Sequence, residues 1–107
     1  MSNFEKQLSS NIKWQPEMSL CIPRMDTSTS IDFIITTFNR LNLCKINKII
    51  ELPLKNTIGY KRVILNVVWH HTDTSEEIIE KLTNGESIKI VYGMPWYWKL
   101  MLAAKKK

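Results

Sequence analysis

The chain has 107 residues, of which 44% are hydrophobic and 23% are charged. That length and composition fit one globular domain with a buried core and exclude a multidomain enzyme. The formal net charge of +5 permits an acidic partner such as nucleic acid, but part of it comes from the closing run Lys105 to Lys107.

The cysteine pattern and the hydropathy indicate an intracellular protein. Cys21 and Cys44 lack the CxxC spacing of redox and zinc motifs, so we interpret them as reduced thiols. The first residues are polar and do not resemble a signal peptide. No segment approaches the roughly 20 apolar residues that span a bilayer. We therefore expect a soluble protein that is not secreted.

Three segments are expected. Residues 1–17 are polar and form an N-terminal arm, residues 18–99 form the domain, and residues 100–107 form a basic C-terminal tail.

The first half of the domain predicts a strand and an amphipathic helix. Residues 19–25 alternate as a strand does. The segment Thr29 to Asp32 resembles a capping box, and apolar residues then recur at helical spacing. Asn42 is expected to end this helix in the left-handed conformation. The apolar positions of the helix are Ile31, Ile34, Ile35, Phe38 and Leu41.

Two strands are expected next. Residues 45–54 are rich in Ile, the neighbours Ile49 and Ile50 indicate a bulge or burial on both faces, and Pro53 favours an edge position. Residues 60–70 alternate, with Val63, Leu65, Val67 and Trp69 on one face.

A second helix and a last strand complete the pattern. Thr74 to Glu77 reads as a capping box, Gly85 is placed to end the helix, and residues 88–92 form the strand. The order βαββαβ predicts an α+β, ferredoxin-like domain. We expect both helices on one face of a four-stranded antiparallel sheet with strand order 4-1-3-2.

The strand pattern resembles the RNA-recognition motif (RRM). Leu20, Ile22 and Met25 match the aliphatic positions of its first signature strand, and Arg62, Val67 and Trp69 match the second. The positions that stack bases in that family are Cys21, Ile64 and Asn66 here, so the aromatic rings are missing.

A second resemblance covers four short stretches, residues 21–24, 53–56, 84–92 and 95–99. In these stretches the chain is similar to small uncharacterised RRM-like proteins of large eukaryotic DNA viruses, the giant viruses. The resemblance implies a viral protein acting inside the infected host cell, in a cytoplasmic viral factory or in the virion.

The sheet face opposite the helices is expected to be mostly apolar. Its expected residues are Cys21, Pro23, Ile64, Asn66, Val68, Lys89 and Val91. Large apolar faces are rarely left bare. Two segments of the chain could cover this face, the arm that carries Trp14 or the segment 96–98. Otherwise a protein partner, a second copy of the chain or stacked bases would cover it.

Residues 95–99 form the densest aromatic cluster and end in a lysine, a combination typical of single-stranded nucleic acid binding. In a strand, Trp96 and Trp98 would share one side and Tyr97 would take the other. The two Trp rings either bind bases or a partner, or fold back over the core as a lid. The candidate binding residues are Arg24, Arg62, Asn66, Lys89, Trp96, Trp98 and Lys99.

No catalytic, cofactor or metal constellation is evident. His70 and His71 would point to opposite sides of a strand, without a third ligand at a useful spacing. The sequence therefore favours a non-enzymatic binding module for RNA or single-stranded DNA, engaged by basic residues and the Trp cluster. The alternative is a protein-interaction or structural module, for example a homodimer, that uses the apolar sheet face.

Overall fold

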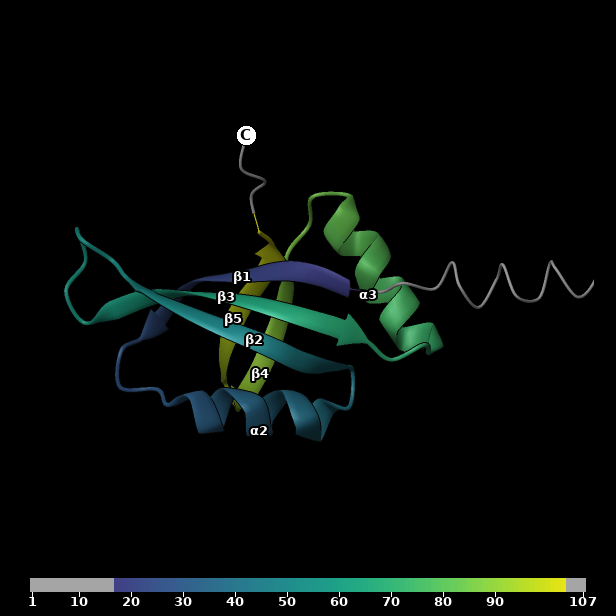
Figure 1. Ribbon diagram of the computed structural model, residues 1–107, viewed down its shortest axis with the longest axis horizontal. Helices are drawn as coiled ribbons and strands as arrows, with labels where there is room; N and C mark the ends of the chain where they lie inside the picture. Colours follow the sequence, from purple (N-terminus) through teal and green to yellow (C-terminus); the bar gives the residue numbers. More distant parts are fainter. Residues whose placement is uncertain (1–16, 104–107) are drawn as a thin grey trace, which may run out of the picture.

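The computed structural model describes residues 17–103, which form two helices and one five-stranded antiparallel sheet (Figure 1). The elements in chain order are β1 (Glu17–Asp26), α2 (Ile31–Leu41), β2 (Cys44–Pro53), β3 (Tyr60–Trp69), α3 (Asp73–Thr83), β4 (Ile88–Gly93) and β5 (Trp96–Leu102). The expected arm lies almost wholly outside the described residues, as do Trp14 and the terminal lysines.

Strand β3 pairs with β1 on one side and with β2 on the other. Its alternate side chains Val63, Leu65 and Val67 are fully buried, as the sequence pattern predicted. The pairing with β2 shifts between Ile46 and Lys48, so the expected bulge exists but lies a few residues before the two adjacent isoleucines.

The expected sheet of four strands in the order 4-1-3-2 is not what the structure shows. The order is β2-β3-β1-β5-β4, so β5 takes the place beside β1 and β4 moves to the edge. Leu102 lies opposite Leu20, and Leu100 is fully buried. Because these two leucines belong to the core, the first residues of the segment assigned to the tail are part of the sheet.

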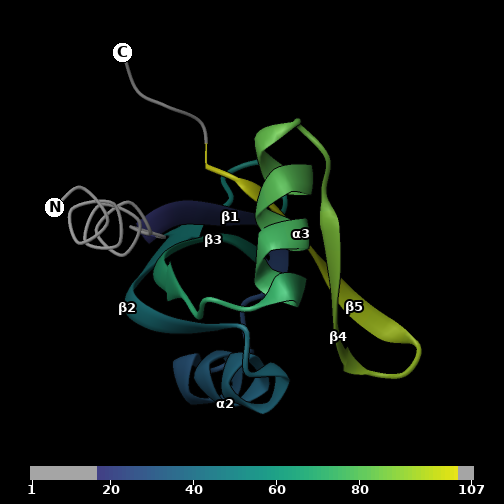
Figure 2. The ribbon, with the colours of Figure 1, turned by 90° about the vertical axis from the view of Figure 1, so that its right-hand side faces the viewer.

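The sheet curves, and α3 stands at the end of the curve where β3 stops (Figure 1 and Figure 2). Helix α2 contacts β2, and Phe33 on α2 also contacts rings of β4 and β5, so this helix lies across the open side. A single buried cluster joins both helices to all five strands. Its members are Leu20, Ile22, Met25, Ile34, Phe38, Cys44, Val63, Leu65, Val67, Trp69, Leu82, Ile90, Trp98 and Leu100.

Helix α2 ends where the sequence predicted, but its N-cap is Ser30, one residue after the Thr29 of the predicted capping box. The Ser30 side chain accepts a hydrogen bond from the Phe33 backbone N–H, which satisfies one free donor of the first turn. Asn42 has φ 55° and ψ 41°, the left-handed conformation expected at the helix end.

Helix α3 begins earlier than predicted. Its N-cap is Thr72, whose hydroxyl accepts from the Ser75 N–H, so the capping box assigned to Thr74 is wrong. The reason is tertiary: Ser75 is fully buried and donates its hydroxyl to the Leu43 carbonyl, which sets the first turn against the start of β2. Gly85, at φ 91°, follows the helix end as expected.

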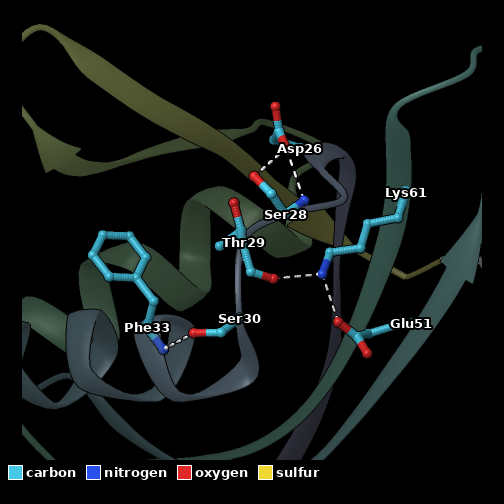
Figure 3. Close-up of polar contacts among 7 residues, drawn as sticks. All are labelled: Asp26, Ser28, Thr29, Ser30, Phe33, Glu51 and Lys61. Atoms are coloured by element: carbon cyan, nitrogen blue, oxygen red, sulfur yellow. Dashed lines mark hydrogen bonds and ion pairs between the residues drawn. The ribbon is translucent and has the colours of Figure 1, made fainter.

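One buried cation ties the start of α2 to the sheet (Figure 3). Lys61 is 6% exposed, donates to the Thr29 carbonyl over 2.7 Å and pairs with Glu51. In the preceding turn, hydrogen bonds from the Ser28 hydroxyl and backbone N–H lower the pKa of the Asp26 carboxyl. The crossover from β1 to α2 is therefore held by charge-assisted hydrogen bonds.

Within residues 17–103, no helix is long and apolar enough to cross a membrane.

Candidate functional site

The side of the sheet that faces away from both helices, called the outer face here, is the candidate site. Side chains of paired residues in an antiparallel sheet point to the same side, so the strand register defines this face. It consists of Glu17, Ser19, Cys21, Arg24, Asp26, Lys45, Lys48, Ile50, Leu52, Tyr60, Arg62, Ile64, Asn66, Val68, Lys89, Val91, Tyr97, Lys99 and Met101.

An apolar row crosses the middle of the outer face. Ile50 pairs with Ile64, Ile64 with Cys21, and Cys21 with Met101, so the row runs through β2, β3, β1 and β5. Ile50 is 38% exposed, and Cys21 is buried beneath its neighbours. An apolar row of this kind can pack against the faces of bases or against a protein partner.

A polar row lies beside it. Asn66 pairs with Lys48 on one side and with Ser19 on the other, and the Ser19 hydroxyl donates to the Asn66 side-chain oxygen over 2.7 Å. Because that bond occupies only the carbonyl oxygen of the amide, the NH₂ of Asn66 is oriented as a donor on the open surface.

Cations surround the two rows. They are Arg24, Lys45, Lys48, Arg62, Lys89 and Lys99, and they come from all five strands. The carboxylates on the same strands at this side are Glu17 and Asp26, at the two ends of β1. The outer face therefore carries a strong positive field, which attracts polyanions.

The acidic residues gather elsewhere. Asp73, Glu76, Glu77 and Glu80 line one surface hollow on α3, on the helix side of the sheet. In the described part of the chain, the charges are therefore separated: the outer face is basic and α3 is acidic.

Two tyrosines of the outer face contact cations. The Arg24 guanidinium carbon lies 4.2 Å from the centre of the Tyr60 ring, and the Lys89 Nζ lies 4.8 Å from the centre of the Tyr97 ring. Tyr60 is the first residue of β3 and Tyr97 lies on the β4–β5 hairpin, each four residues along its strand from a member of the apolar row. The face therefore has aromatic rings, although not at the RRM stacking positions.

Neither cysteine is prepared for nucleophilic chemistry. Burial raises the pKa of Cys21, and the positive charge of Arg62 offsets part of that rise. Burial raises the pKa of Cys44 to about 12. Both thiols are protonated near neutral pH and serve as small apolar side chains.

The Trp cluster divides between the core and the surface. Trp98 is 4% exposed, stacks on Tyr92 at 4.6 Å and meets the edge of Phe33 at 6.0 Å. The expectation that Trp98 binds bases or a partner is therefore corrected, because its ring is already enclosed by the core. Trp96 shares that side of β5, lies beyond the core and is 63% exposed.

The structure brings most of the predicted site residues together. Arg24, Arg62, Asn66, Lys89 and Lys99 share the outer face, whereas Trp96 and Trp98 lie on the other side of β5. The tryptophans thus do not cover this face.

Among the outer-face residues that sequence reasoning did not place there are two lysines and two tyrosines, Lys45, Lys48, Tyr60 and Tyr97. With them, the face is more basic than the mostly apolar surface that was expected. A signal existed, since Lys45 lies between the apolar Cys44 and Ile46 and so had to point outward.

No family model, curated protein or solved structure matches this chain. Within residues 17–103, His, Cys, Asp and Glu side chains form no group of three or more that could hold a metal ion. The proposals below therefore rest on the geometry and charge of the outer face.

Proposed function

We propose that the protein is a non-enzymatic binding module that takes RNA or single-stranded DNA on the outer face of its sheet. The observation that carries the proposal is the combination of the apolar row with six flanking cations on one side of the molecule. Cations neutralise phosphates, and the row offers an apolar surface to bases.

The arrangement also supports an RRM-like relationship. The strands β2, β3 and β1 have the neighbours expected of that family, and β5 stands where its fourth strand would lie. The viral origin implied by the sequence resemblance belongs to the same proposal, as does a role inside the infected cell.

A salt titration tests the proposal directly. If about five phosphates are contacted, the logarithm of the binding constant for a single strand falls with a slope near −3.5 against the logarithm of salt concentration. Between 50 and 200 mM salt, affinity for a fluorescent oligonucleotide then falls about 100-fold. An absence of binding at 50 mM salt refutes the proposal.

A pair of matched variants locates the binding surface. Lys48→Gln removes one cation from the outer face, and Lys81→Gln removes one from α3, so both change the net charge equally. Lys48→Gln should weaken binding about fivefold at 0.1 M salt and lower the slope by about 0.7. Equal effects of the two variants would show that only net charge matters.

The alternative, a protein-interaction or homodimer module, relied on a mostly apolar sheet face. The six cations oppose close contact between two copies of this face, because like charges would be brought together. A stable dimer in light scattering that survives high salt and blocks oligonucleotide binding would favour this alternative.

A further inference from the structure

Two lysines face each other directly on the β4–β5 hairpin. Lys89 pairs with Lys99, so their Cβ atoms are separated by about 5 Å, and both side chains are exposed on the outer face. Like charges at opposed positions destabilise a strand pair. Within residues 17–103, neither Lys89 nor Lys99 has a carboxylate partner. An anion placed between the two lysines would relieve their repulsion.

An aromatic ring stands beside this pair. Tyr97 precedes Lys99 by two residues, which places the two side chains on the same side of β5 about 7 Å apart. The Tyr97 ring is half exposed and has the Lys89 ammonium above it. A charge-assisted hydrogen bond to a phosphate is stronger than an exposed cation–π contact, so a phosphate would draw Lys89 away and uncover the ring.

The hairpin is continuous with the rest of the outer face. Met101, two residues beyond Lys99, belongs to the apolar row and pairs with Cys21. A chain bound at the hairpin can therefore continue across β1 and β3 without leaving the basic surface.

We propose that Lys89, Lys99 and Tyr97 form a nucleotide subsite, in which a phosphate lies between the lysines and the adjoining unpaired base stacks on Tyr97. The subsite rests on the proposed function and adds a binding preference to it. A base within a duplex is already stacked and paired, so only a single strand can use the ring. The protein should therefore prefer single-stranded over double-stranded nucleic acid of the same sequence.

The test compares one fluorescent oligonucleotide, single-stranded and annealed, across variants at 0.1 M salt. Tyr97→Ala should weaken single-strand binding at least about fivefold, leave duplex binding unchanged and so abolish the preference. Tyr97→Phe should restore it, because the ring is retained. The double variant Lys89→Gln, Lys99→Gln should weaken single-strand binding about 25-fold and lower the salt slope by about 1.4.

The outcomes separate the subsite from the proposed function. If Lys48→Gln weakens binding but the hairpin variants bind as the wild type does, the subsite is wrong and the outer face remains the interface. If the wild type binds the duplex as tightly as the single strand, the predicted preference for single strands is wrong. If the wild type binds neither probe at 50 mM salt, the proposed function fails and the subsite with it. Circular dichroism of each variant verifies that the sheet is intact.

Discussion

Replacing Trp98 tests whether this residue belongs to the core. Trp98→Ala removes a side chain that is 4% exposed, and such truncations cost about 3–5 kcal/mol. The stacked contact with Tyr92 and the edge contact with Phe33 contribute about 0.5–1.5 kcal/mol each beyond buried area, which places the loss toward the upper end. A domain of this size has about 5–15 kcal/mol of total stability, so a loss of about 4 kcal/mol removes about a quarter or more of it.

Urea unfolding followed by far-ultraviolet circular dichroism measures this loss. With a denaturant dependence of about 2 kcal/mol per molar, a loss of 4 kcal/mol lowers the unfolding midpoint by about 2 M. Trp98→Phe should lose less, because a ring still meets Tyr92. Trp96→Ala is the matched control: Trp96 is 63% exposed, so its loss should stay within about 0.5 kcal/mol. A Trp98→Ala variant that keeps the wild-type midpoint but fails to bind oligonucleotides would place Trp98 in an interface instead.

Three further predictions concern the buried ion pair, the cap of α3 and a buried thiol. Glu51→Gln leaves the buried Lys61 ammonium without its carboxylate and should cost about 1.5–3 kcal/mol in chemical denaturation. Lys61→Met should cost less, because Glu51 can turn to water. A larger loss for Lys61→Met than for Glu51→Gln would contradict the role of Glu51 as partner of a buried charge. Thr72→Ala should cost about 1 kcal/mol, because the cap of α3 is lost, whereas Thr74→Ala should cost under about 0.5 kcal/mol. Equal losses would instead support the capping box predicted at Thr74. The folded Cys44 thiol has its pKa raised to about 12 from 9.0, so it stays protonated while the unfolded thiol ionises. The contribution of this thiol to the free energy of unfolding is complete below pH 9. It falls by up to about 1.4 kcal/mol per pH unit between pH 9 and 12. Cys44→Ala should show a shallower decline of the urea midpoint from pH 9 to 10.5, and identical declines would refute this.

Local signals were sufficient for the first four strands, for the end of α2 and for part of the site. The alternation of Val63, Leu65 and Val67 predicted β3 and the direction in which Arg62 and Asn66 point. Asn42 correctly marked the end of α2, and the predicted capping box placed its start one residue before the observed N-cap Ser30. These features depend on neighbouring residues in the chain, since side-chain period and capping hydrogen bonds act over a few positions.

The tertiary structure decided which strand stands beside β1 and therefore what the outer face contains. Residues 88–92 and 96–102 both have strand patterns, and the choice between them depends on which buries more apolar surface against α2 and β1. With β5 inserted, Trp98 and Leu100 enter the core and Lys99 turns outward to meet Lys89. The sequence by itself determined that Trp96 and Trp98 would share one side of a strand. Only packing determined that this side faces the core and that Tyr97, with its lysines, remains on the open surface.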